Sequence, residues 1–199
     1  MMSSEPPAVP ENPLGTTSVE VYLSELASAL KDLAHEPLMQ VLAVLRRARA
    51  EHRHVFVFGN GGSASTASHM ACDLAKNTRH IGEANLRIIA LTDGIATLSA
   101  YANDDGYETV FAEPLRSLGR SGDVAIAISA SGNSPNVLRA IRVAKELDME
   151  TIALSGSGGG QLTELVDVAV LVPARSTEQT EDVHLIVNHI LTVAMRDQR

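Results

Sequence analysis

Cysteine, tryptophan and aromatic residues in general are scarce in this chain of 199 residues. The one cysteine, Cys72, excludes an internal disulfide, and such sparse cysteine usage is typical of a reducing compartment. We expect Cys72 to be a buried, unreactive thiol because it lies in the apolar helical stretch HMACDLA. Aromatic residues make up 3% of the chain, so the core must consist of Ala, Leu, Val and Ile. Such a core suits helices packed on both faces of a parallel sheet.

The sequence also lacks a basic region, a secretion signal and an apolar run of membrane-spanning length. The formal net charge is −8, and no run of Lys and Arg is long enough to neutralise a nucleic-acid backbone. The first residues contain neither the basic nor the apolar region of a secretion signal. Apolar runs such as VDVAVLV are far short of a membrane span. We therefore expect a cytoplasmic protein that binds neither nucleic acid nor membranes.

The organisation of the chain is that of an α/β protein. Residues 1–17, rich in Pro, Ser and Glu, are expected to form a flexible tail, and residues 18–199 a single domain. Two N-terminal helices are followed by strands that alternate with helices, which predicts a three-layer sandwich with a five-stranded parallel sheet ordered 2-1-3-4-5. The predicted strands are 55–59, 86–92, 123–129, 151–156 and 166–173, and the predicted helices are 18–33, 37–51, 63–77, 95–102, 107–118, 134–148 and 178–196.

Two loops rich in Gly and Ser each follow a predicted buried strand and precede a helix. They are GNGGSAS at 59–65 and SASGNSPN at 129–136. Glycines let the backbone approach a ligand, helix N-termini offer unpaired N–H groups, and serine hydroxyls add neutral donors. Such loops can bind an anion without Lys or Arg. Because strands one and three are neighbours at the switch point of this sheet, we expect the loops to meet there. The predicted anion donors are Ser63, Ser129, Ser131 and Ser134.

Other interpretations of the glycines stay open. Each loop could consist of ordinary turn and cap residues, although two such loops at the switch point favour a ligand site. GNGGSA also fits the dinucleotide-binding pattern, but the next strand ends at Asp93, about 34 residues past Gly59, where an acidic residue is expected after about 20. A third cluster, SGSGGG at 155–160, follows strand four and is interpreted as a flexible helix-entry loop.

Histidines and carboxylates recur on two predicted helices. His69 and Asp73 are four residues apart and share a helix face. Glu181 and His189 are eight residues apart on the last helix, an offset of roughly 80°. These four residues could form a divalent metal site, with Zn²⁺ favoured, or could act as acid and base on a sugar. A lone histidine on a helix is more often packed or solvated, and His184 is assigned no chemistry.

The segments GNGGSASTASHMACDL and ISASGNSPNV resemble the signature loops of SIS (sugar isomerase) domain proteins, most closely the phosphoheptose isomerase branch. The resemblance begins near residue 18 and includes NDDGYETVF (103–111) and EDVHLIVNHIL (181–191). It implies a homotetramer with sites near subunit boundaries. The implied phosphate contacts are Ser63, Ser129, Ser131 and Ser134, with Ala130 in the same loop as the last three. The implied sugar contacts are Asn60, Gly61, Gly62, Asn103, Asp104 and Glu181. The implied metal and catalytic set is His69, Asp73, Glu181 and His189.

The resemblance implies an aldose–ketose isomerase that acts on sedoheptulose 7-phosphate through a metal-assisted enediolate. Asp73 and His189 would move the protons. Three positions depart from the family pattern: Asp73 stands where Glu is usual, Glu181 where Gln is usual, and Asn77 where Arg is usual. The alternatives are an isomerase of a different sugar phosphate and a non-catalytic phosphosugar-binding or adaptor protein of the kind that binds a replication initiator. The paired histidines favour the enzyme.

Overall fold

The computed structural model describes residues 17–82 and 84–197. The predicted flexible tail, 1–17, lies outside these residues except for Thr17. The helices are α1 (Ser18–Lys31), α2 (His35–Ala50), α3 (Gly62–Lys76), α4 (Ile95–Asp104), η1 (Tyr107–Thr109), α5 (Ala112–Leu118), α6 (Pro135–Glu146), α7 (Gly160–Leu165) and α8 (Thr177–Arg196). The strands are β1 (His54–Gly59), β2 (Arg87–Ala90), β3 (Val124–Ser129), β4 (Glu150–Gly156) and β5 (Val168–Val172).

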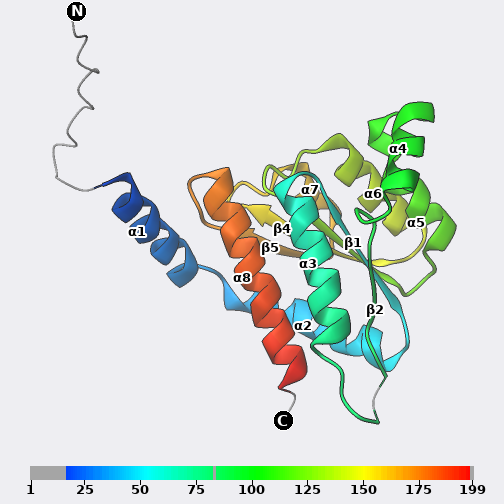
Figure 1. Cartoon of the computed structure of the whole chain (residues 1–199), viewed down its shortest axis with the longest axis horizontal. Helices are drawn as coiled ribbons and strands as arrows, with labels where there is room; N and C mark the ends of the chain where they lie inside the picture. The colour runs from blue at the N-terminus through cyan, green and yellow to red at the C-terminus, as the bar shows by residue number, and fades with distance from the viewer. Residues whose placement is uncertain (1–16, 83, 198–199) are drawn as a thin grey trace, which may run out of the picture.

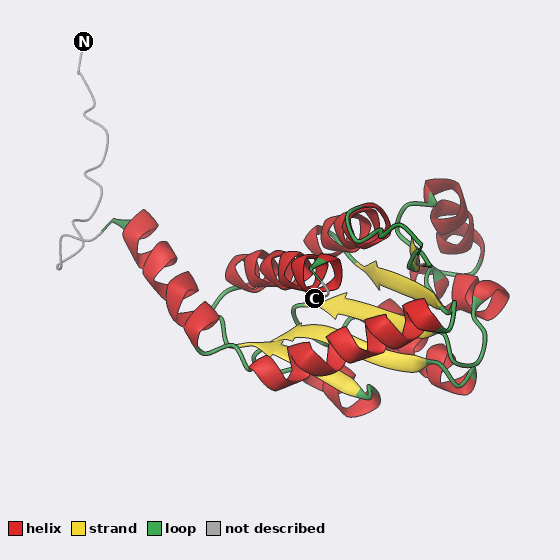
Figure 2. Ribbon diagram, turned by 90° about the horizontal axis from the view of Figure 1, so that it is seen from below, coloured by secondary structure: helices red, strands yellow, loops and turns green. Residues whose placement is uncertain are grey.

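The five strands form one sheet in the order β2-β1-β3-β4-β5, and every neighbouring pair is parallel. Figure 2 shows this twisted sheet between helices that cover both of its faces. The predicted α/β class, three layers and strand order are thus confirmed. In this order β1 and β3 are neighbours although α3, β2, α4 and α5 separate them in the chain. The carboxyl ends of these two strands therefore lie side by side.

Side chains alternate between the two faces of the sheet and form two apolar cores. On β1, Val55 and Val57 face the core shared with α2, α3 and α8, whereas Phe56 and Phe58 face the core shared with α5 and α6. The same alternation runs along β3 and β4. Because both faces are covered, the strands are nearly continuous aliphatic runs, which is the pattern that made them recognisable in the sequence.

Apart from small shifts of element ends, the structure differs from the sequence predictions in two helical elements and in the burial of one side chain. Helix α7 was not predicted because it has six residues and begins at a glycine with positive φ, Gly160. The predicted helix at 107–118 is a 3₁₀ turn followed by the separate helix α5. The prediction that Cys72 is buried is wrong, since its side chain is exposed. The buried face of α3 carries Ala67, Met70 and Leu74, and Cys72 falls on the opposite side of the helix.

Helix α1 extends away from the rest of the molecule (Figure 1). A capping box between Thr17 and Glu20 defines its start. Polar contacts join the helix to α8: the Tyr22 hydroxyl donates to Asp182 at 2.7 Å, a bond that raises the pKa of Tyr22 to about 12. The apolar side chains of Val19 and Leu23 are exposed. The helix thus presents apolar surface that the described part of the chain does not cover.

The longest helix, α8, packs along α2 and α3 with a buried face that includes Val183, Val187 and Leu191. Its His184 is fully buried, and neither ring nitrogen makes a hydrogen bond of normal geometry. His184 is therefore a packed core histidine, in agreement with the absence of an assigned chemical role for it in the sequence-based prediction.

None of the described helices, α8 included, is long and apolar enough to cross a membrane.

Stability is expected to fall below pH 6.5 because of His184. Burial lowers its pKa from 6.5 to about 4, and the nearby backbone of Ser155 offsets only part of this effect. Between these values the unfolded chain binds a proton that the folded chain does not, so stability decreases as the pH falls, by about 3 kcal/mol in all. The variant His184→Leu cannot titrate and should show a flatter dependence of the urea unfolding free energy on pH. An unchanged pH dependence in this variant would contradict the assignment.

Candidate functional site

The first Gly/Ser loop connects β1 to α3 at the carboxyl edge of the sheet. A Cβ on Gly59 would lie only 2.6 Å from the carbonyl oxygen of Ile128 on β3, so the close approach of the two strands requires glycine here. Gly61 has a φ of +54°, which favours glycine, and precedes the first helical residue, Gly62. The tight turn brings Ser63, in the first turn of α3, close to β3.

The second loop connects β3 to α6. Ser134 occupies the N-cap position with Pro135 as the first helical residue, as the sequence predicts, yet its side chain makes no capping bond. Its hydroxyl lies instead 3.4 Å from the Ser129 hydroxyl. Gly132 has a φ of +63° and packs against the backbone of Gly159. The third glycine cluster, interpreted from the sequence as a helix-entry loop, does lead into α7, and its backbone at Gly159 also contacts the second loop at Gly132.

A pair of carboxamides joins the two loops. The Asn60 amide donates to Asn136 at 2.9 Å, and the Asn136 amide donates back to Asn60 at 2.8 Å. The Tyr107 hydroxyl adds a third bond, to the Asn60 oxygen, at 3.1 Å. Asn136 is buried and was not singled out in the sequence analysis. The two loops therefore meet, as the strand order predicts.

A cavity of about 190 Å³, called the anion cavity below, lies between the loops. No Lys or Arg is among its lining residues, so its donors are neutral hydroxyls and amides. The N-termini of α3, α6 and α8 converge on it, and each contributes backbone N–H groups and the positive end of a helix dipole. This is the arrangement in which a protein of negative net charge can bind a phosphate. The lining residues are Asn60, Ser63, Ile128, Ser129, Ala130, Ser131, Ser134, Thr177 and Glu181.

Four predicted sugar contacts do not line this cavity. Gly61 and Gly62 lie in the adjoining turn, and a Cβ on Gly62 would overlap the Glu181 carboxylate. Asn103 and Asp104 lie at the end of α4, where the Asn103 amide donates to Asp104 at 2.7 Å. Asp104 borders a different depression, along α4. Within one copy of the chain these last two side chains are thus apart from the two loops.

Further along α3 and α8, two histidines and an aspartate converge. His69 Nε2 lies 3.2 Å from Asp73 Oδ2, and His189 Nε2 lies 3.7 Å from the same oxygen. The imidazole rings meet edge to face, with centroids 5.1 Å apart. One ligand atom from each residue lies within 4.8 Å of the others. The two histidine side chains are about half exposed, at 43% and 52%, whereas Asp73 is largely buried. The cluster is therefore accessible on the side of the histidines.

This cluster fits a divalent metal. Two imidazole nitrogens and one carboxylate oxygen are the donor set of a catalytic zinc site with an open position. Glu181, the fourth predicted ligand, is not part of the cluster in the structure: its carboxylate lies over Gly62 and lines the cavity. The structure thus brings together three of the four predicted ligands and places the fourth at the anion cavity.

Two asparagines hold the Asp73 carboxylate. Asn77, at the C-cap of α3, donates to Oδ1 at 3.1 Å, and Asn188 on α8 donates to Oδ2 at 3.1 Å. Asn188 was missed in the sequence analysis. A buried amide directly before His189 is unfavourable without a partner, but the buried face of α8 carries other polar residues as well, so the sequence alone did not single Asn188 out.

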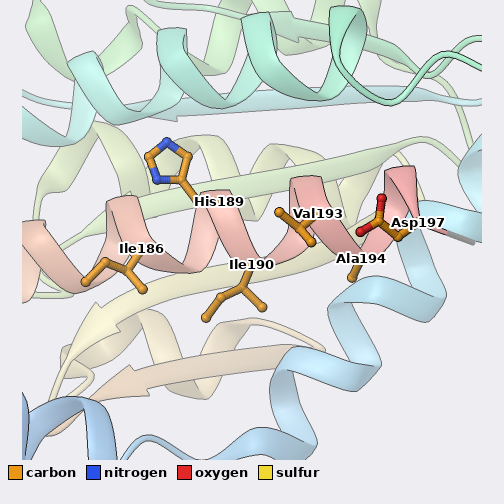
Figure 3. Close-up of a pocket in the computed structure, with 6 residues that line it drawn as sticks. All are labelled: Ile186, His189, Ile190, Val193, Ala194 and Asp197. Carbon is orange, nitrogen blue, oxygen red and sulfur yellow. The ribbon is translucent and has the colours of Figure 1, made fainter.

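The exposed side of α8 carries an apolar depression of about 500 Å³. Ile186, Ile190 and Val193 line it, together with His189, Ala194 and Asp197. Figure 3 shows His189 on the side of α8 that faces α3, with Ile186 and Ile190 on the other side of the helix. The histidine cluster therefore borders an uncovered apolar surface.

Comparison with known proteins identifies similar sequences and structures. The SIS domain family model matches residues 21–156. A phosphoheptose isomerase of Helicobacter pylori is 41% identical over 174 residues, which cover 87% of this chain and 86% of the relative. The structure of phosphoheptose isomerase GmhA from Neisseria gonorrhoeae superposes with a TM-score of 0.80 at 33% identity and covers 89% of this chain and 94% of that one. A phosphoheptose isomerase from Francisella tularensis superposes with a TM-score of 0.81 at 28% identity, over 90% of this chain and 95% of that one.

Proposed function

Since this chain belongs to the SIS domain family, we propose that it is a phosphoheptose isomerase, an aldose–ketose isomerase that converts sedoheptulose 7-phosphate into a heptose 7-phosphate. One observation carries the proposal: α3 and α8 pack side by side, begin at the anion cavity and continue to the histidine cluster. Ser63 at the cavity and His69 in the cluster are six residues apart on α3, a rise of about 9 Å. An extended sugar phosphate can bridge this separation.

The phosphate binds in the cavity between the loops. The hydroxyls of Ser63, Ser129, Ser131 and Ser134 donate to its oxygens, together with backbone N–H groups of the helix N-termini. Each such bond to a charged acceptor contributes about 1.5–3 kcal/mol. Because these donors are short hydroxyls and backbone N–H groups, the backbone of the two loops determines the orientation of the bound phosphate, and no long cationic side chain is needed.

The isomerisation moves hydrogen between C1 and C2 of the sugar. Asp73 removes a proton from C1 of the ketose, the electron pair forms the C1–C2 double bond, and the C2 carbonyl oxygen gains a proton from His189. Return of a proton to C2, with loss of the proton from the C1 hydroxyl, gives the aldose. Both groups lie within one cluster, so the proton need not leave the site.

A divalent metal, which we take to be Zn²⁺, would be held by His69, Asp73 and His189. Glu181 is proposed as a further ligand or as a sugar contact, in keeping with its place beside the cavity. When bound, the metal would polarise the substrate carbonyl and stabilise the negative charge that develops on its oxygen before the oxygen is protonated, as in an enediolate.

The test combines metal analysis of the purified protein with an NMR assay of sedoheptulose 7-phosphate turnover. Turnover that is lost on chelation and restored by Zn²⁺ is expected. Bound metal without turnover of this substrate would indicate a different sugar phosphate, in line with Asp73 and Glu181 where Glu and Gln are usual. Phosphosugar binding with neither metal nor turnover would indicate the adaptor.

We further propose that the protein is a cytoplasmic homotetramer with sites near its subunit boundaries. The exposed apolar side chains of α1 and the apolar depression on α8 support this assembly, because surfaces of this kind mark interfaces. Asn103 and Asp104 remain predicted sugar contacts, which assembly would have to bring to a cavity.

The assembly predicts that charges on these surfaces dissociate the oligomer. Leu23→Asp on α1 and Ile190→Asp on α8 are expected to shift the mass measured by light scattering from tetramer to smaller species, because a buried unpaired carboxylate is strongly unfavourable. Leu118→Asp, at an exposed position on α5, is the matched control and should leave the mass unchanged. If both α1 and α8 variants retained the parent mass, these surfaces would not be the interface.

A further inference from the structure

Asn188 is a buried amide between the two helices that carry the histidine cluster. Its side chain is fully buried on α8, and its Nδ2 donates to Asp73 Oδ2 on α3 at 3.1 Å. Its Oδ1 is buried without a hydrogen-bond partner among the described residues. A half-satisfied amide is unfavourable in a core, and a leucine of similar shape would avoid that cost. Stability alone therefore does not account for asparagine at this position.

The Asp73 carboxylate needs a fixed orientation. It has two free torsions, and the same oxygen, Oδ2, lies nearest to both His69 and His189. Asn77 contacts the other oxygen and belongs to the end of α3 itself. Asn188 alone among these partners makes a hydrogen bond to Oδ2 from across the helix interface, and it directly precedes His189 in the chain. This hydrogen bond therefore holds the Asp73 carboxylate of α3 in place relative to the segment of α8 that carries the His189 imidazole.

We propose that Asn188 is a positioning residue, which directs Asp73 Oδ2 toward the space between His69 and His189. It touches neither substrate nor metal and acts through Asp73. The short aspartate makes this role necessary, because a misplacement of about 1 Å in a reacting group can lower a rate about a hundredfold. The inference rests on the proposed function of Asp73 as base and metal ligand.

The test replaces Asn188 by leucine, which keeps the shape and removes the donor. We expect the affinity for Zn²⁺ added to the metal-free protein, measured by calorimetric titration, to fall by roughly 10–100-fold, as is typical for loss of a group that orients a ligand. The kcat should fall by a similar factor with KM for the sugar phosphate nearly unchanged, because the phosphate cavity is untouched. The melting temperature should not decrease, since the unpaired Oδ1 is removed as well. Asn188→Ala, which adds no bulk, should show the same losses in affinity and kcat.

The matched control is Thr192→Val, one turn further along α8. Its hydroxyl is also buried without a partner, so this variant should keep both metal affinity and kcat. Equal losses of melting temperature, kcat and metal affinity in Thr192→Val and Asn188→Leu would show a merely structural role and overturn the proposal.

A second comparison separates this inference from the proposed function. Asp73→Asn should abolish turnover; if it does not, Asp73 is not the base and the proposed function of the cluster fails. If Asp73→Asn is inactive while Asn188→Leu equals the parent in kcat and Zn²⁺ affinity, the cluster stands and the positioning role of Asn188 is refuted. Asp73→Glu in the Asn188→Leu background should recover part of the lost kcat, because the longer side chain reaches the histidines without the amide.

Discussion

Replacing His189 with alanine is expected to abolish turnover while phosphosugar binding stays close to that of the parent. The loss should be about 10²–10⁴-fold in kcat, the range for removal of an acid–base group. In the proposed mechanism His189 is a proton-transfer group, and it is also one of the three residues that could hold a metal, so two effects would be lost together. It does not line the anion cavity, and the offset of eight positions from Glu181 to His189 corresponds to a rise of about 12 Å along α8. The proposed phosphate contacts should therefore remain intact.

The measurement pairs the NMR turnover assay with calorimetric binding of the sugar phosphate. Ser131→Ala is the complementary variant, since Ser131 lines the cavity and lies outside the histidine cluster. It should weaken binding about 10-fold or more while a residual kcat survives at saturation. His35→Ala, an exposed histidine at the start of α2, serves as the control for loss of an imidazole. Turnover by His189→Ala at the parent rate would refute the chemistry assigned to the cluster.

Much of the fold could be predicted because local patterns determine it. The strands are aliphatic runs bounded by Gly, Ser or charged residues, and their alternation with helices predicts a parallel sheet, for which 2-1-3-4-5 is one of the common strand orders. Where length was marginal, prediction failed: α7 has six residues and an entry of consecutive glycines that resembles a loop. The exposure of Cys72 was missed because the apolar stretch around it was taken as a whole, whereas the helical period decides which side is buried.

The site was predictable to the extent that it depends on chain-local signals. Gly and Ser at the ends of β1 and β3 marked the loops, and the spacing of His69 and Asp73 marked one helix face. Contacts that depend on long-range placement were not visible. The Asn60–Asn136 pair spans 76 residues and the Asn188–Asp73 bond spans 115. Asparagine occurs widely in turns and caps, so its presence alone did not distinguish these structural roles.

The second large effect is expected for Gly132→Ala, in the loop that closes the anion cavity. Gly132 has a φ of +63°, and a Cβ there would overlap the carbonyl oxygen of Gly159. The atoms that this Cβ would meet belong to the backbone of Gly159 and Gly160, so no flexible side chain can move aside. The Leu162 N–H also donates to the Gly132 carbonyl at 3.0 Å, which ties the loop to α7. Left-handed strain and overpacking each cost about 1–3 kcal/mol. The loop must therefore move away from the 156–160 segment and displace Ser131 from the cavity.

Gly132→Ala should consequently lose measurable phosphosugar binding and unfold at lower urea concentration than the parent. Gly158→Ala is the matched control from the adjoining glycine cluster, because a Cβ at Gly158 meets nothing within 4 Å. Its unfolding free energy should stay within about 0.5 kcal/mol of the parent value, with binding retained. The two variants therefore distinguish two reasons for a glycine in these loops. Gly132 is required by close packing next to the proposed phosphate donors, whereas Gly158 lies in a turn with open space around it. If Gly132→Ala bound the sugar phosphate as tightly as the parent, the donors that hold the phosphate would have to lie outside this loop.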